Sequence, residues 1–214
     1  LTTGEQWEVG SKLDFLDGRG SATVALYEIV RRDFTVKDSN NPNLTVQAGQ
    51  QTSRGIELAG KLQVTSKLLA EANYAYVNAE YDEFNEAVNG VSVSREGNTP
   101  TNVPDSVANA WLTYDIDPAW KAGVDARYVD SVFADNANTE AETADGANGR
   151  IPGYMLFSSR AAYDFGPQLS DLNVAVGVKN IFNKQYFTRS FDDNNKGKYV
   201  GEPRTVYVQT SIAF

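Results

Sequence analysis

Hydrophobic and polar residues alternate one by one along most of the chain, in short segments separated by polar connections. In residues 120–129, for example, the apolar side chains Trp120, Val124 and Tyr128 alternate with charged ones such as Lys121 and Asp125. A period of two puts successive side chains on opposite faces of a β-strand. The pattern recurs along the chain and predicts an all-β, antiparallel protein. We expect nine strands, within residues 6–16, 21–37, 52–64, 68–81, 106–116, 120–129, 150–165, 170–187 and 203–214.

The connections between these strands alternate between short and long. Short turns are expected at 17–20, 65–67, 116–118 and 166–170, and long polar segments at 38–51, 82–104, 132–151 and 188–202. Within the third long segment, residues 132–149 are acidic and of low complexity, which is typical of a mobile surface loop. In an antiparallel meander this alternation puts every long loop at one end of the sheet. Outer-membrane β-barrels have this asymmetry, with short periplasmic turns and long extracellular loops.

The polar face of the predicted strands carries many charges. The candidates for this face are Glu8, Lys12, Asp14, Glu57, Lys61, Glu71, Lys121, Asp125, Arg127, Arg160, Asp164 and Lys179. Burying so many charges in a dry core would cost several kcal/mol each, whereas a water-filled lumen removes that cost. The apolar face of 120–129 has an aromatic residue at each end, as expected for a lipid-facing strand that meets two aromatic belts. For 21–37 the faces are ambiguous, because Val24 and Leu26 compete with Tyr27 and Ile29.

Composition removes several classes of function. The chain has no Cys and no His, which excludes disulfides, thiol catalysis, zinc enzymes and His-dependent triads. The net charge of −9 argues against nucleic acid as a partner. No GxSxG, P-loop or GxGxxG pattern is present, so we expect neither enzymatic activity nor a cofactor. No run approaches the roughly 18 apolar residues of a transmembrane helix. The chain opens on LTTGEQWEVG without a signal-like segment, which predicts a mature chain or a fragment.

Short phrases of the sequence resemble TonB-dependent outer-membrane receptors. VKNIFNKQY at 178–186 is similar to the "v-N-l-f-d-k-x-Y" strand of that family, with Asn183 where the family usually has Asp. It is followed by GEPRT at 201–205, similar to the "G-x-P-R-t" that precedes the final strand, and by a terminal aromatic residue, Phe214. The phrases SRGIEL at 53–58 and PGY at 152–154 also look like the family.

The resemblance implies a transmembrane antiparallel β-barrel in the outer membrane of a Gram-negative bacterium. Nine is an odd number, whereas bacterial single-chain barrels are even. Residues 1–214 would therefore be the C-terminal portion of a barrel with 22 strands and a plugged lumen, with the plug domain and the earlier strands upstream or in another chain. The two outer strands, 6–16 and 203–214, would be open edges that pair with the rest of the receptor.

The same resemblance implies the partners. They are a ferric siderophore or related metal chelate, outer-membrane lipids, TonB through the plug region, and the remainder of the receptor barrel. Candidate ligand contacts flank the last long loop: Tyr186, Phe187, Arg189 and Tyr199. Aromatic rings and a guanidinium suit an anionic or aromatic iron chelate. For Tyr186 and Phe187 the alternative is a place in the outer aromatic belt.

Two further motifs have plainer interpretations. DDNNKG at 192–197 is similar to a calcium loop, but Lys196 occupies a ligand position, so a solvated turn is the better interpretation. Asp125 with Arg127, and Arg160 with Asp164, are better explained as lumen salt bridges or contacts to a plug than as acid–base pairs.

Three hypotheses remain for the function. The first is a TonB-dependent receptor for a metal chelate. The second is a passive porin or adhesin-like barrel, which would lack a plug. The third is a soluble β-sandwich binding module with a buried core between two sheets.

Overall fold

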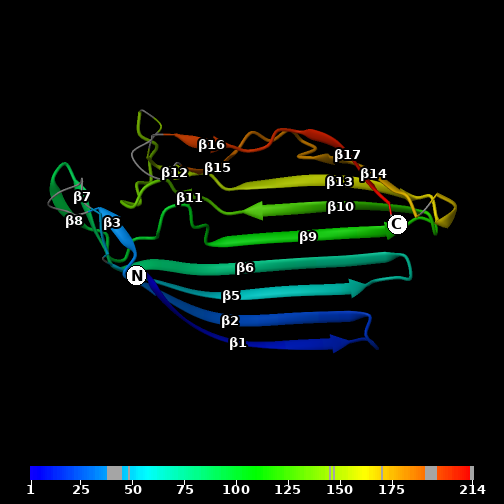
Figure 1. Ribbon diagram of the computed structural model, residues 1–214, viewed down its shortest axis with the longest axis horizontal. Coiled ribbons are helices and arrows are strands. Elements are labelled where there is room, and N and C mark those ends of the chain that lie inside the picture. The colour runs from blue at the N-terminus through cyan, green and yellow to red at the C-terminus, as the bar shows by residue number, and fades with distance from the viewer. Residues whose placement is uncertain are drawn as a thin grey trace.

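The chain forms one large antiparallel sheet (Figure 1). The computed structural model describes residues 1–37, 45–47, 49–144, 146, 148–169, 171–190 and 197–212. The nine strands of the sheet are β1 (Thr3–Phe15), β2 (Gly20–Arg32), β5 (Gln50–Gln63), β6 (Leu68–Glu83), β9 (Ser106–Asp115), β10 (Trp120–Val129), β13 (Tyr154–Asp164), β14 (Asn173–Lys179) and β17 (Thr205–Ser211). The predicted number of strands is confirmed. Phe214, the terminal aromatic residue of the resemblance, lies outside the described residues.

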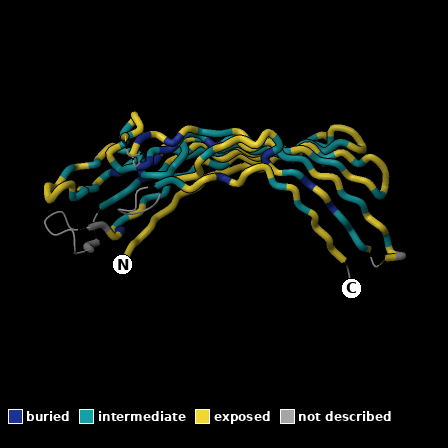
Figure 2. The backbone as a smooth tube through the Cα atoms, turned by 90° about the horizontal axis from the view of Figure 1, so that it is seen from above, coloured by how far each residue is buried: buried dark blue, intermediate teal, exposed yellow. Residues whose placement is uncertain are grey.

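Each strand pairs with the next one along the chain, in the order β1-β2-β5-β6-β9-β10-β13-β14-β17. The sheet is curved and forms an arch in Figure 2. Its outermost strands, β1 and β17, do not pair with each other, so the described chain does not close into a ring. This confirms the prediction of two open edges.

The pairing register separates two unlike faces. One row across the sheet runs from Lys61 opposite Glu71, through Trp111, to Asp125. All twelve charged residues predicted for the polar face lie on the same face as this row, because directly opposed residues point to the same side of the sheet. The other face is apolar and uncovered: Trp7 is 71% exposed and Val206 is 67% exposed. A soluble sandwich with a core between two sheets is therefore wrong.

The ambiguous segment 21–37 is two strands. β2 ends at Arg32, Asp33 adopts a positive φ of 55°, and β3 (Thr35–Lys37) starts a separate hairpin. Val24 lies opposite Leu58 on the apolar face, while Tyr27 lies opposite Gly55 on the polar face. No bulge interrupts the pairing of β2 with β1 or β5. The space above Gly55 admits the Tyr27 ring, so an aromatic side chain fits on the polar face.

The two ends of the sheet differ as predicted (Figure 1). At one end the strands are joined by short turns, one containing the 3-10 helix η1 (Pro167–Leu169). At the other end the long connections contain small hairpins. These hairpins are β3 with β4 (Thr45–Gln47), β7 (Asn85–Val88) with β8 (Val91–Ser94), β11 (Val132–Phe133) with β12 (Arg150–Ile151), and β15 (Phe187–Ser190) with β16 (Lys198–Val200).

A charged ladder lies on the apolar side of the sheet, near the long-loop end. The Arg54 guanidinium lies 2.5 Å from the Glu28 carboxylate and 3.7 Å from that of Glu80. Arg32 pairs with Glu5 at 3.3 Å one strand further out. These residues lie beyond the apolar part of each strand, so the strands continue past the region that suits a lipid interior. The alternation of polar and apolar residues did not predict this ladder. It indicates the face of the sheet on which a residue lies, but not how far along the strand the lipid-facing region extends.

The contact between Gly55 and its neighbours generates a stability prediction. A Cβ at Gly55 would overlap the Tyr27 phenol and lie 2.5 Å from the backbone oxygen of Tyr76. We expect Gly55→Ala to destabilise the folded receptor by about 1–3 kcal/mol through overpacking. The measurement is urea titration of the full-length receptor, with folded and unfolded forms separated by gel mobility. Gly60→Ala is the control, since its Cβ would meet nothing nearer than Ser21 O at 3.9 Å. Equal midpoints for the two variants would contradict the prediction.

Candidate functional site

The long-loop end holds most of the buried side chains of the described chain. Phe34 and Tyr81 are buried, and their ring centroids lie 6.2 Å apart. Phe84 adds a third ring, 4.7 Å from that of Tyr81. Next to them, Val132 and Ile151 are 6% and 1% exposed. The loops are thus packed against one another at this end of the sheet. The region around Phe34, Tyr81, Phe84, Val132 and Ile151 is called the loop cap below.

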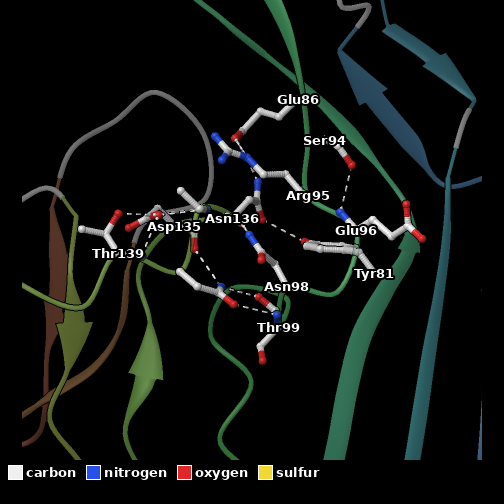
Figure 3. Close-up of polar contacts among 12 residues, drawn as sticks. Tyr81, Glu86, Ser94, Arg95, Glu96, Asn98, Thr99, Asp135, Asn136 and Thr139 are labelled. Atoms are coloured by element: carbon white, nitrogen blue, oxygen red, sulfur yellow. Dashed lines mark hydrogen bonds and ion pairs between the residues drawn. The ribbon is translucent and has the colours of Figure 1, made fainter.

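Asn136 is the centre of a polar network that ties two long connections together (Figure 3). Its side-chain oxygen accepts a hydrogen bond of 2.8 Å from the Tyr81 hydroxyl, and its backbone oxygen accepts one of 2.7 Å from the Asn98 amide. Its own amide donates to Glu86 at 3.1 Å. Glu86 also accepts from Arg95 at 2.7 Å. The connection 132–151, predicted to be mobile, is therefore fastened to the connection that carries β7 and β8.

The Tyr81 phenol stays protonated in this network. It lies beyond the apolar part of β6, and burial raises its pKa to about 12, with a smaller contribution from the Glu86 carboxylate. A raised pKa means that the folded state holds this proton more tightly than the unfolded chain. The stabilisation is therefore complete below the unfolded pKa of about 10 and is lost as the pH rises from there towards 12. At neutral pH the phenol is a permanent donor to Asn136.

The last long connection joins the same cap. The Asn102 side-chain oxygen accepts hydrogen bonds from the Ser190 backbone nitrogen at 2.7 Å and from its hydroxyl at 3.0 Å. Lys198 on β16 pairs with Glu142 of the β11–β12 connection, and its side chain is only 8% exposed. The β15–β16 hairpin is thereby held over the cap.

The four predicted ligand contacts divide into two groups. Tyr199 and Phe187 are exposed on the hairpin, and the Arg189 guanidinium lies 4.7 Å from the centre of the Tyr199 ring. Lys198 places its ammonium 5.7 Å from the Phe187 ring. Phe187, Arg189 and Tyr199 thus form a cationic and aromatic surface at the rim, with the largely buried Lys198 beneath it.

Tyr186 has a different environment. Its ring packs against that of Tyr154, with centroids 4.3 Å apart, and covers Gly201, where a Cβ would overlap it. Tyr154 lies opposite Val129 on the polar face of the sheet, so Tyr186 faces the inner wall below the hairpin and not the lipid belt. Sequence reasoning missed Tyr154 and Lys198, because only their spatial neighbours distinguish them from other strand residues.

The described residues contain no group of three or more His, Cys, Asp or Glu side chains that could hold a metal ion. The calcium-like stretch DDNNKG falls on residues 192–196, outside the described residues, apart from Gly197. No helix in the described part of the chain is long and apolar enough to cross a membrane.

The sheet has one lipid-compatible face and one charged face. It also has short turns at one end and packed loops at the other, and these features together are typical of the wall of an outer-membrane β-barrel. Comparison with known proteins agrees. A family model described as "TonB dependent receptor-like, beta-barrel" matches residues 2–181. The chain belongs to this family, whose members sit in the outer membrane of Gram-negative bacteria and are transporters without enzymatic activity. The resemblance found in the sequence is confirmed.

Similar proteins share the whole length of the chain. The metal-pseudopaline receptor CntO of Pseudomonas aeruginosa is 28% identical over 215 residues, which are 99% of this chain and 28% of that protein. The ferrioxamine receptor of Yersinia enterocolitica is 27% identical, covering 99% of this chain and 28% of that protein. The unliganded crystal structure of the ferric citrate transporter FecA superposes with a TM-score of 0.82 at 41% identity, covering 98% of this chain and 31% of that one. The chain thus spans less than a third of the length of these relatives.

The Asn136 network predicts a local effect on the loops. In the full-length receptor, Asn136→Ala removes the side-chain bonds of Asn136 to Tyr81 and Glu86, while the bonds between Asn138 and Thr99 remain. We expect amide hydrogen exchange at Asn98 to become about 10- to 100-fold faster, since a lost buried hydrogen bond costs about 1–3 kcal/mol. Asn148→Ala is the control, because Asn148 lies in the same connection and is exposed. Unchanged exchange in Asn136→Ala would show that the network does not hold the loops.

Proposed function

We propose that this chain is part of a receptor that takes up an iron siderophore or similar metal chelate across the outer membrane by TonB-coupled active transport. Residues 1–214 would form the C-terminal portion of the barrel, with the plug domain and the earlier strands elsewhere in the receptor. TonB would act through the plug region, and the open edges of β1 and β17 would pair with the remaining strands. No cofactor is needed for this function.

The observation that carries the proposal is the Arg189–Tyr199 pair on a hairpin held by the loop cap. A scarce chelate must be held at the outside before it is transported, and the long-loop end is the part of the wall that faces outwards. A guanidinium beside an exposed aromatic ring offers both charge and a flat contact surface to an anionic or aromatic chelate. The similar proteins whose names mention metal-pseudopaline, ferrioxamine and ferric citrate support a chelate as the substrate class.

The test is chelate capture by variants of the full-length receptor. We expect Arg189→Glu and Tyr199→Ala each to weaken binding by about 1–3 kcal/mol, because each removes a contact that the bound chelate would desolvate. Binding of iron-loaded chelates to cells and growth on the chelate as sole iron source are measured, with surface expression verified for every variant. The chelates are ferric citrate, ferrioxamine B and metal-loaded pseudopaline.

Two control variants lie at the opposite end of the sheet. Arg19→Glu makes the same charge change in a short turn. Asp117→Ala removes the carboxylate that accepts hydrogen bonds of 2.9 Å from the backbone nitrogens of Ala119 and Trp120. We expect the turn variants to alter the amount of assembled receptor but not its affinity. If loop variants bind like the parent while turn variants lose affinity at equal expression, the assigned orientation and ligand surface are both wrong.

A further inference from the structure

The cations on the polar face of the sheet fall into two groups. Each lysine has a carboxylate partner: Lys12 with Asp14 at 4.0 Å, Lys61 with Glu71 at 3.7 Å, Lys121 with Asp115 at 3.5 Å and Lys179 with Glu202 at 3.3 Å. Arg31 stacks on Phe34, 5.5 Å from the ring centre. Arg127 and Arg160, in contrast, are exposed and form neither an ion pair nor a hydrogen bond with any described residue.

The ion pairs expected for these arginines are not formed within the described chain. Asp125 lies on the same face between them, opposite Ser158, and pairs with neither. Asp164 is four residues from Arg160 on the same strand, about 13 Å away along it. One carboxylate between two guanidiniums cannot neutralise both, so this part of the wall keeps a surplus of positive charge.

Arg127 and Arg160 lie on the polar face of the neighbouring strands β10 and β13, at increasing distance from the long-loop end. Tyr186 of the last connection packs on Tyr154, and Tyr154 lies opposite Val129, two positions after Arg127 on the same face. Arg127 lies on β10, opposite Leu156 of β13. Arg160 lies on β13, opposite Gly123 of β10. Four residues separate Arg127 from Gly123, so the arginines are about 13 Å apart along the strands, with Arg127 nearer the loops.

The surroundings of Arg160 leave room for a ligand. On one side a Cβ at Gly123 would meet the Leu112 backbone oxygen at 3.4 Å and the Thr113 hydroxyl at 3.8 Å, so only one side-chain atom comes within 4 Å of it and no ring covers this glycine. On the other side Gly177 is covered by the Tyr207 ring. A guanidinium binds carboxylates with two parallel hydrogen bonds and is less strongly hydrated than an ammonium. An arginine between an open glycine and an aromatic ring therefore suits a flat, carboxylate-bearing ligand.

We propose that Arg127 and Arg160 are successive binding positions for the carboxylates of an anionic metal chelate as it moves from the rim along the β10–β13 wall. This inference rests on the proposed function and adds to it the charge class of the substrate. Positively charged side chains along a pore wall select anions in the same way. The lysines of the wall do not serve this purpose, because their charges are already matched.

The test uses the full-length receptor in cells with Arg127→Gln, Arg160→Gln and the double variant. Lys61→Gln is the matched control, since it also removes one positive charge from the same face but from an existing ion pair. The probes are ferric citrate, an anionic carboxylate chelate, and ferrioxamine B, which carries a positive charge. Binding without energised transport and the initial rate of iron uptake are measured separately, and receptor thermal stability is recorded for each variant.

We expect the double variant to take up ferric citrate about tenfold more slowly, with surface binding within about twofold of the parent, in line with the loss of charge-assisted hydrogen bonds. Each single variant should show a smaller loss, and Lys61→Gln should behave like the parent. Unchanged ferric citrate uptake in the double variant would overturn the proposal.

The remaining outcomes separate this inference from the proposed function. If the variants lose uptake of both chelates together with thermal stability, the arginines bind the part of the receptor that fills the lumen, and the proposal is wrong. If the parent takes up ferrioxamine B but not ferric citrate, the inference fails and the proposed function stands. If the parent takes up none of ferric citrate, ferrioxamine B and metal-loaded pseudopaline, both are overturned.

Discussion

The structure depends on one constraint: the two faces of a single β-sheet must be stable in two different environments, lipid on one side and water on the other. Its apolar face is uncovered, with Trp7 and Val206 among the most exposed side chains, and its other face carries more than twelve charged residues. A water-soluble sheet would need a second layer over the apolar face, and a dry core would need the charges removed. A wall between lipid and a wet lumen satisfies both faces without further packing. Membership of an outer-membrane family agrees with this physical requirement.

The same constraint explains why ordered packing concentrates at the long-loop end. Within the sheet, backbone pairing and the two solvents supply the stability, so few side chains are buried there. Beyond the lipid region the connections need their own core, which Phe34, Tyr81 and Ile151 provide. Hydrogen bonds made by the side chains of Asn136 and Asn102 then join connections that are distant in sequence. The candidate ligand surface on β15 and β16 is positioned by these ties, and not by the sheet alone.

The wall below the rim carries cations in two different environments. Ion pairs match the lysines with carboxylates one by one, whereas Arg127 and Arg160 form no ion pair with any described residue. The contact between the Tyr186 and Tyr154 rings joins the last long connection to this part of the wall. In the proposed function, binding at the outside and movement along the inner wall would involve different residues on adjoining elements.

The sequence by itself determined the strands, their two faces, the end that carries the long loops and the family. These properties are local, because a strand alternates its side chains residue by residue and a turn depends on a few neighbouring residues. Only the tertiary structure decided the Glu28–Arg54–Glu80 ladder, the Asn136 network, the packing role of Tyr186 and the finding that Arg127 and Arg160 form no ion pair with a described residue. Those properties depend on which residues the register brings together, as with Ser190 and Asn102, which are 88 positions apart. Alternation assigns a residue to a face, but pairing register, depth and side-chain direction decide what it contacts there.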